Sequence, residues 1–202
     1  MEIFLSICLG LGLSAACGFR VFVPLLCLSI AAHFKIVPLA GSFAWVGSDA
    51  ALFAFAAATL LEVGAYYIPW LDNALDTLAG PAAVLAGIFV TASVITDIDP
   101  FWRWTLAVIA GGGLAATTQL ATTKARLASS VTTGGLGNPV LATVEGISST
   151  VLSVVAVLWP IVALVLVLII LTGCALVIWF VGKRLVKWFR RKPETPRLTP
   201  AA

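Results

Sequence analysis

Residues 3–33 read IFLSICLGLGLSAACGFRVFVPLLCLSIAAH, an apolar stretch with one charged side chain, Arg20. An apolar run of about 18 residues or more is typical of a helix that crosses a membrane. This run is longer than one crossing needs, and Gly18-Phe19-Arg20-Val21-Phe22-Val23-Pro24 interrupts it with a glycine and a proline, which disturb helices. The stretch therefore predicts one membrane helix that is broken around Arg20. The alternative is a chain that folds back on itself at this break.

The composition of the whole chain agrees with a membrane environment. Of its 202 residues, 61% are hydrophobic and 10% are charged, and the mean hydropathy is +1.10. Soluble domains are usually about 25% charged, so this chain could not cover a surface that faces water. The composition excludes a soluble enzyme and a disordered chain. At about 20 residues per helix, it predicts an all-α integral membrane protein with about six transmembrane helices.

Five further apolar stretches complete the predicted set of spans. They are Ala50–Trp70, Pro81–Thr96, Arg103–Thr122, Val140–Trp159 and Ile161–Val181. If the first stretch folds back between Gly18 and Pro24, the set has seven spans instead of six. Gly111-Gly112-Gly113 lies inside one of these spans, where small residues allow close helix packing.

The basic residues divide the chain into a transmembrane domain, residues 1–182, and a basic tail, residues 183–202. Seven of the twelve lysines and arginines lie in the tail. With both termini in the cytoplasm, Lys124, Arg126 and the seven tail residues give nine basic residues inside, against Lys35 and Arg103 outside, as the positive-inside rule requires. We expect the tail to contact anionic lipid headgroups, and we expect no nucleic-acid partner.

Six spans also divide into two sets of three, with halves at residues 1–97 and 101–182. Because three is odd, the second set enters the membrane from the opposite side, which is the arrangement of inverted repeats in transporters. Each half would carry a broken helix segment, near Gly18–Pro24 and near Gly134–Pro139. The residues expected to break the helices are Gly18, Pro24, Gly134, Gly135, Gly137 and Pro139.

Two charged residues lie deep within predicted spans of the first half, Arg20 and Glu62. Ionisable groups inside a bilayer are costly, so they usually face the bundle interior and find partners. Arg20 could bind an anion or neutralise a carboxylate along a substrate path. The alternative is a structural ion pair with Glu62 that joins two helices.

Asp72 and Asp76 are four residues apart, so a helix would present both carboxylates on one face. Such a pair could hold Mg²⁺ together with phosphate oxygens. A solvated loop in which Asp72 caps a helix is the interpretation that the spacing favours. The sequence predicts no cofactor and no other metal ligands.

The second half contributes Lys124, Arg126, Asn138 and Glu145 to the candidate polar residues. Lys124 and Arg126 are two residues apart and point to different sides of a helix. The glycine-rich segment before Asn138 could form an exposed loop, or a re-entrant loop whose backbone N–H groups meet an anion.

A set of short motifs runs through the chain. They are Gly18-Phe19-Arg20-Val21-Phe22-Val23-Pro24-Leu25, Glu62 with Ile68-Pro69-Trp70-Leu71-Asp72-Asn73-Ala74-Leu75-Asp76, Lys124-Ala125-Arg126 and Gly134-Gly135-Leu136-Gly137-Asn138-Pro139. As a set they resemble a family of bacterial membrane proteins designated domain of unknown function 4126, over residues 3–180. The resemblance implies a small protein of the bacterial inner membrane without an established activity. It marks these matching positions but implies no role for them: Arg20, Pro24, Glu62, Asp72, Asp76, Arg126, Asn138 and Pro139.

Three functional hypotheses follow from the placement of these charges. The first is a small transporter- or channel-like protein with an intramembrane polar path. The path would use Arg20, Glu62, Asp72, Asp76, Lys124, Arg126, Asn138 and Glu145. The second is a Mg²⁺-dependent membrane enzyme acting on a phosphorylated lipid, and the third is a structural or lipid-organising protein. The pattern favours the first and a protein that is not an enzyme; association into homo-oligomers stays open.

Overall fold

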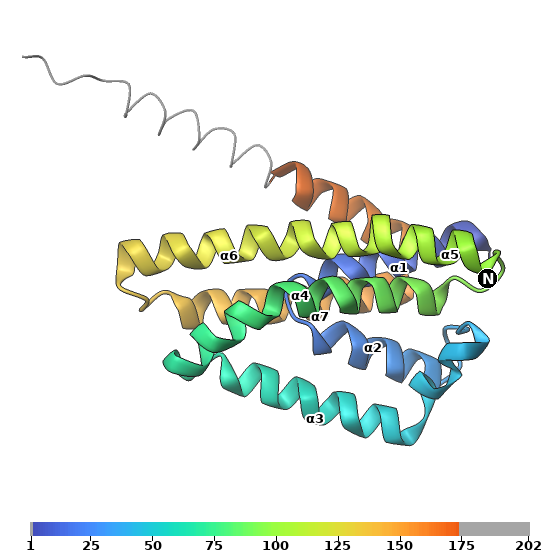
Figure 1. Cartoon of the computed structure of the whole chain (residues 1–202), viewed down its shortest axis with the longest axis horizontal. Helices are drawn as coiled ribbons and strands as arrows, with labels where there is room; N and C mark the ends of the chain where they lie inside the picture. The colour runs from blue at the N-terminus through green and yellow to red at the C-terminus, as the bar shows by residue number, and fades with distance from the viewer. Residues whose placement is uncertain (1, 174–202) are drawn as a thin grey trace, which may run out of the picture.

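A computed structural model describes residues 2–173, with the side chains of residues 69–77 excepted. This part of the chain is all-helical and contains no strand. Its elements are α1 (Ile3–Cys17), α2 (Phe22–His33), η1 (Gly41–Gly47), α3 (Asp49–Ala65), α4 (Pro69–Val94), α5 (Pro100–Leu106), η2 (Ala107–Gly112), α6 (Gly113–Thr133) and α7 (Asn138–Leu158) (Figure 1). A further apolar helix begins at Pro160 and is described as far as Gly173. The predicted basic tail, residues 183–202, and the end of the predicted last span lie outside the described residues.

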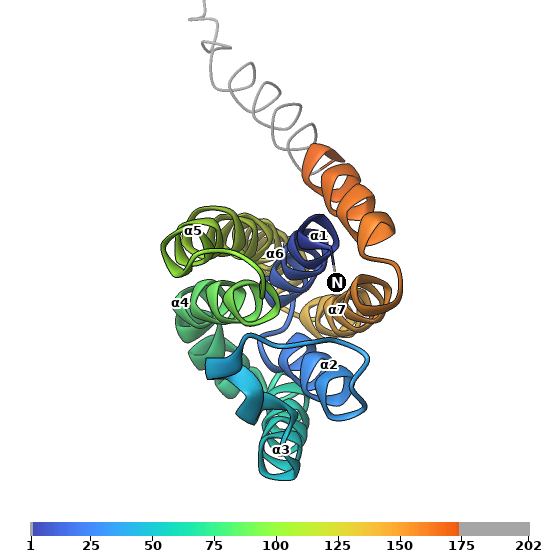
Figure 2. The same ribbon diagram turned by 90° about the vertical axis from the view of Figure 1, so that its right-hand side faces the viewer.

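α1 lies in the middle of the bundle, among α4, α6 and α7 (Figure 2). Its contacts with α7 fix its direction. The Ser149 hydroxyl donates a hydrogen bond to the Ala16 carbonyl (3.0 Å), near the end of α1. Nearer the start of α1, a Cβ atom built on Gly12 would lie 2.9 Å from the Cβ of Ala156. Because the residue numbers fall along one helix as they rise along the other, α1 runs antiparallel to α7.

α2 runs in the opposite direction to α1. The Arg20 side chain, just before α2, reaches the Ala142 carbonyl near the start of α7, and the later residues of α2 line a common cavity with α7 as far as Val151. The chain therefore folds back between Cys17 and Phe22, and α2 returns toward the end where α1 began (Figure 1). The expectation of a single span over residues 3–33 is wrong, and the fold-back alternative describes the chain.

The described part of the chain does not confirm the predicted six spans. Two helices of the described part are long and apolar enough to cross a membrane, Pro100–Thr133 with 34 residues and Asn138–Leu158 with 21 residues. A third candidate is the pair η1 and α3, which is bent by 65°. α1 has 15 residues and α2 has 12, so at 1.5 Å per residue they measure about 22 and 18 Å, less than the ~30 Å of a hydrocarbon core.

The longest helix is built from α5, η2 and α6. The middle piece, η2, is a π-helical turn that carries two of the three consecutive glycines. A Cβ atom on Gly111 would lie 2.9 Å from the Gly87 carbonyl oxygen of α4, and the Ser14 hydroxyl of α1 donates to the Gly111 carbonyl. The glycines therefore allow close packing of α1, α4 and η2, as the sequence predicted.

The segment Gly134–Pro139 forms the turn between α6 and α7. Gly134 and Gly135 have positive φ angles of 63° and 89°, and a left-handed glycine directly after a helix ends it. Pro139 lies in the first turn of α7, where its missing N–H is not needed. Pro24 likewise lies in the first turn of α2 and does not break it. The predicted break at residues 18–24 is therefore confined to Gly18–Val21.

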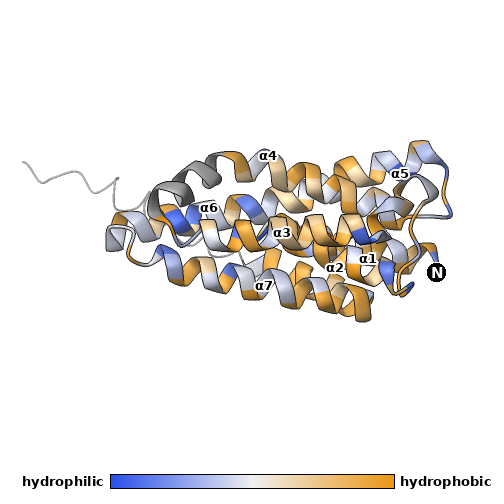
Figure 3. Ribbon diagram, turned by 90° about the horizontal axis from the view of Figure 1, so that it is seen from below, coloured by the Kyte–Doolittle hydropathy of each residue, from blue (hydrophilic) through white to orange (hydrophobic). Residues whose placement is uncertain are grey.

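α3 lies at the margin of the bundle, beyond α2 (Figure 2). Only Ala51 and Glu62 of this helix are buried, whereas Leu60 and Leu61 are each 75% exposed. Exposed apolar side chains occur on the other helices too, among them Val108, Leu120, Ile147 and Val151. Hydrophobic residues make up most of the ribbon, and hydrophilic residues gather on α6 and at the two ends of the bundle (Figure 3). An apolar exterior of this kind suits a hydrocarbon surrounding rather than water.

Candidate functional site

Arg20 is held inside the bundle at the fold-back between α1 and α2. Its side chain is 2% exposed, and its Nη2 atom donates a hydrogen bond to the Ala142 carbonyl oxygen of α7 (2.7 Å). Gly18 makes this position possible, because a Cβ atom there would lie 2.5 Å from the Cβ of Thr118 in α6. The break in the helix therefore brings a guanidinium group into the protein interior.

A second arginine approaches the same point from α6. Arg126 donates from Nε to Oε1 of Glu145 (3.1 Å) and from Nη2 to Oε2 of the same carboxylate. This two-point contact is the strong geometry for an arginine and a carboxylate. The Nη2 atom of Arg20 lies 3.7 Å from Oε2 of Glu145. One buried glutamate of α7 therefore faces two arginines.

Tyr66, directly after α3, completes the group. Its ring centroid is 3.6 Å from the guanidinium carbon of Arg20 and 4.6 Å from that of Arg126. A cation over an aromatic ring in a desolvated site contributes about 2 kcal/mol. We call Arg20, Tyr66, Arg126 and Glu145 the buried charge cluster. It joins the fold-back to α3, α6 and α7.

Glu62 of α3 has a different partner from the predicted one. Its Oε1 atom accepts the Val21 N–H (2.8 Å) and its Oε2 atom accepts the Phe22 N–H (3.0 Å). These N–H groups belong to the start of α2, where backbone donors lack helical partners and the helix dipole favours a negative charge. No ion pair joins Arg20 to Glu62 among the described side chains. The predicted Arg20–Glu62 pair is therefore replaced by Arg20–Glu145 and by a carboxylate cap on α2.

Arg20 and Glu62 also line different cavities. Arg20 lies in a cavity of about 480 Å³ between α2, α3 and α7, and Glu62 lies in one of about 550 Å³ between α2, α3 and α4. The sequence predicted that both charges line one path. Because the Glu62 carboxylate turns toward the start of α2, the two charges instead lie on opposite flanks of the α2–α3 pair.

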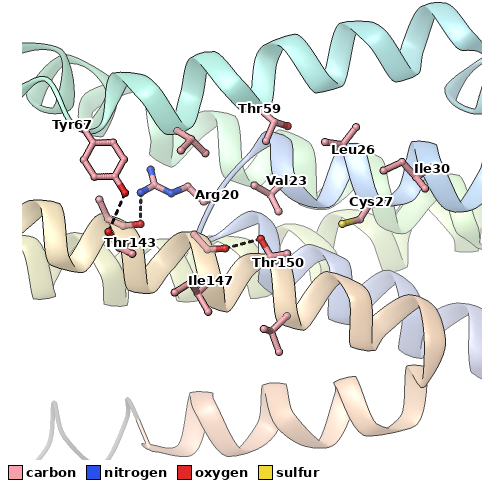
Figure 4. A pocket seen from close by; sticks show the side chains of 14 residues that line it. Arg20, Val23, Leu26, Cys27, Ile30, Thr59, Tyr67, Thr143, Ile147 and Thr150 are labelled. Carbon is pink, nitrogen blue, oxygen red and sulfur yellow. Dashed lines mark hydrogen bonds between the residues drawn. The ribbon is translucent and has the colours of Figure 1, made fainter.

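The cavity at Arg20 has a polar end and an apolar end (Figure 4). Tyr67 and Thr143 lie beside the Arg20 guanidinium, and their hydroxyl oxygens are 3.0 Å apart. Leu26 and Ile30 lie at the other end. The Nε and Nη1 atoms of Arg20 make no hydrogen bond within the described part of the chain. The positive charge of a buried arginine that lines the cavity attracts an anion there.

Lys124 and Asn138 do not line this cavity. Asp72 and Asp76 belong to the first turns of α4, but their side chains are outside the described set, so the predicted Mg²⁺ pair stays a prediction. Among the residues that the structure describes, no group of three or more His, Cys, Asp or Glu could hold a metal ion. Lys124 is exposed on α6. Asn138 begins α7 and donates from Nδ2 to the Ser130 hydroxyl (3.2 Å), which secures the α6–α7 turn.

Sequence reasoning missed Tyr67 and Thr143 and gave Tyr66 no part in binding a cation. A signal was present, because the chain has two tyrosines and they are adjacent at the end of an apolar run. A threonine on a helix face carries no comparable signal. Its role depends on which helix packs opposite, and the sequence does not give that.

The described part is thus an all-helical bundle with candidate membrane spans, an apolar exterior and charges buried inside. The chain matches the family model described as "Domain of unknown function (DUF4126)" over residues 7–181, and it belongs to that family. No curated protein and no solved structure gives a significant match.

Proposed function

We propose that this protein is a small membrane carrier for an anionic solute, with Arg20 as the binding group. The observation that carries the proposal is Arg20, whose side chain is 2% exposed, lies at a helix break and has two nitrogen atoms without hydrogen bonds among the described residues. Burying a charge is expensive, and such residues in membrane helices commonly mark pathways for substrates or ions.

The proposed orientation places the α6–α7 turn on the cytoplasmic side of a bacterial inner membrane. Lys124 and Arg126 lie toward this end, and the sequence assigns the basic tail to the same side. Because α1 and α2 form a hairpin, the N-terminus then lies on the opposite side. This differs from the sequence-based prediction, which counted residues 3–33 as one crossing and placed both termini in the cytoplasm.

The proposed path runs through the Arg20 cavity and not past Glu62. Tyr67 and Thr143 offer hydroxyl groups to an anion beside Arg20, while Glu145 is engaged by Arg126 and is less able to repel the anion. α3 closes one side of the cavity and packs mainly on α2 and η1. In this proposal a shift of α3 opens the site.

Potassium efflux from vesicles tests this proposal. Purified protein is reconstituted into vesicles filled with the potassium salt of chloride, phosphate, acetate or hexanoate, and valinomycin is added. Potassium then leaves only as fast as the anion follows. We expect faster efflux than from empty vesicles with at least one anion, and efflux near the empty-vesicle rate with Arg20→Gln or with Tyr67→Phe/Thr143→Val.

Lys35→Gln is the control, because Lys35 is an exposed cation outside the cavity, and its efflux should equal that of the unchanged protein. Equal rates for all variants and empty vesicles would reject the carrier function. That result would favour the second candidate, a structural protein. The buried charge cluster supports this candidate, because it ties the α1–α2 fold-back to three other helices.

A further inference from the structure

We propose that the cavity between α2, α3 and α7 binds a long-chain carboxylate, with the carboxylate group at Arg20 and the alkyl chain along α2 and α7. This inference rests on the proposed carrier function and names its substrate class. It combines two observations on one cavity: Arg20, a buried cation with two nitrogen atoms that make no hydrogen bond among the described residues, lines one end, and apolar side chains line the other.

The polar end fits a group with a single negative charge. Arg20 keeps Nε and Nη1 free of hydrogen bonds among the described residues, and the hydroxyl groups of Tyr67 and Thr143 lie at the same end (Figure 4). A carboxylate carries one charge, whereas a phosphate monoester carries about 1.5 to 2. One arginine that already lies 3.7 Å from Glu145 can neutralise one charge and not two.

The apolar end fits an alkyl chain. Beyond Arg20, the cavity is lined by Leu26 and Ile30 of α2 and by Ile147 and Val151 of α7. Along α7 the lining extends from residue 142 to residue 151, which is about 14 Å at 1.5 Å per residue. A small inorganic anion would contact only the polar end, whereas a chain of methylene groups would also pack along this length of apolar wall.

The direction of the cavity matches the orientation of a lipid in a bilayer. Ala142 is four residues from the start of α7, so the polar end lies about 6 Å along the helix from the α6–α7 turn. The apolar end, at Val151, lies past the midpoint of α7. A long-chain carboxylate held here keeps its charged group near one membrane surface and its chain in the hydrocarbon.

Binding of tritiated dodecanoate to the full-length protein in nanodiscs tests the inference, with empty nanodiscs as the background. Unlabelled dodecanoate should compete fully. Dodecanol lacks the charge and acetate lacks the chain, so each should compete at least about tenfold more weakly, which is about 1.4 kcal/mol. Acetate that competes as well as dodecanoate would overturn the inference and indicate a site for small anions.

Two variants on α7 separate the cavity from the membrane-facing surface. Val151 lines the cavity, and Val154, one turn further on, does not; both are exposed. Val151→Trp should weaken dodecanoate binding at least about tenfold, and Val154→Trp should leave it within about twofold. These variants leave the buried charge cluster unchanged, so they stay informative if Arg20→Gln does not fold. Equal binding to both tryptophan variants would overturn the inference.

Binding and efflux together distinguish this inference from the carrier function. Dodecanoate binding that depends on Val151 but occurs without efflux of any anion would support the site and reject the carrier. Efflux of small anions without dodecanoate binding would keep the carrier and reject the long-chain substrate.

Discussion

Glu145 is the side chain on which both buried arginines depend. Arg126 contacts its two carboxylate oxygens, and Arg20 lies 3.7 Å from one of them. Each of these groups comes from a different part of the chain, so none can move to water without separating α6, α7 and the α1–α2 fold-back.

We predict that Glu145→Gln lowers the free energy of unfolding by about 3–5 kcal/mol, because it strands buried guanidinium charges. Arg126→Gln alone should also be destabilising, and the double variant should lose less than the sum of the two. Denaturant titration in mild detergent measures all three. Additive losses would show that the contact between Arg126 and Glu145 contributes no coupling energy.

Glu62 is predicted to stabilise the start of α2. Glu62→Gln leaves one oxygen to accept the two N–H groups of Val21 and Phe22 and removes the charge that the helix dipole favours. We expect a loss of about 1–3 kcal/mol in the free energy of unfolding and faster amide hydrogen exchange at these two residues.

Asp49→Asn is the matched control for this change. Asp49 begins α3, and its side chain is 81% exposed and 3.6 Å from His33. An exposed pair of this kind contributes about 0–1 kcal/mol. If the two variants had equal effects, the cap on α2 would not contribute to stability.

The sequence identified the charged members of the buried charge cluster but not their partners. Arg20 could be singled out because a charge in an apolar surrounding must be paired, and Arg126 and Glu145 because they are among the few charged residues of the second half. Which charge meets which depends on the fold-back. The contact from Arg20 to Ala142 spans 122 residues of sequence, and no local pattern encodes a separation of that kind.

The fold-back itself depends on a close approach of two helix backbones. Gly18 lies against α6, where a Cβ atom would come within 2.5 Å of Thr118 and 2.7 Å of the Ala115 carbonyl oxygen. Backbone atoms of a helix cannot move aside to make room for a Cβ atom, whereas the end of a flexible side chain can. The interior position of Arg20, two residues further on, therefore requires a glycine here.

We predict that Gly18→Ala destabilises the protein by about 1–3 kcal/mol, because the added methyl group overpacks the contact. Gly113→Ala is the control, since a Cβ atom there meets nothing within 4 Å, and alanine favours a helix by about 1 kcal/mol over glycine. Thermal unfolding in detergent should move the two midpoints in opposite directions. Equal midpoints would contradict the packing of α1 against α6.

The positions of most helices could be predicted from hydropathy, but the residues at which they begin and end could be predicted less well. Apolar runs located α1, α3, α7 and most of α4, whereas the polar residues 123–133 were expected in a connection and instead extend α6 to Thr133. Such a polar helix carries no hydropathy signal. The direction of α2 could not be predicted either, because an apolar run with a glycine and a proline suits both a kink and a reversal.

At the scale of the whole molecule, different connections between helices lie at the two ends of the bundle. The start of α1, the η1 segment and the α4–α5 connection lie at one end, and the α6–α7 turn lies at the other (Figure 1). In a membrane, these connections must lie on opposite sides.

We predict that a reporter fused to the N-terminus and one inserted after Gly135 report opposite sides of the membrane. Alkaline phosphatase and green fluorescent protein give complementary signals on the two sides, and an insertion after Gly41 should match the N-terminal fusion. If the N-terminus and Gly135 shared a side, α1 and α2 would form one crossing in the cell.

The contact between the fold-back and α7 can form only late in synthesis. α1 leaves the ribosome long before α7, yet the carbonyl of Ala16 receives its hydrogen bond from Ser149, 133 residues later. At about 5–20 residues per second, the interval is on the order of 10 s. During this time a hairpin too short to cross the bilayer, with an arginine at its bend, must be sheltered by the insertion machinery or lie at the membrane surface. A chain released before α7 is made would lack the hydrogen bond from Ser149 to Ala16. We therefore expect proteases to degrade such a truncated chain faster than the complete one.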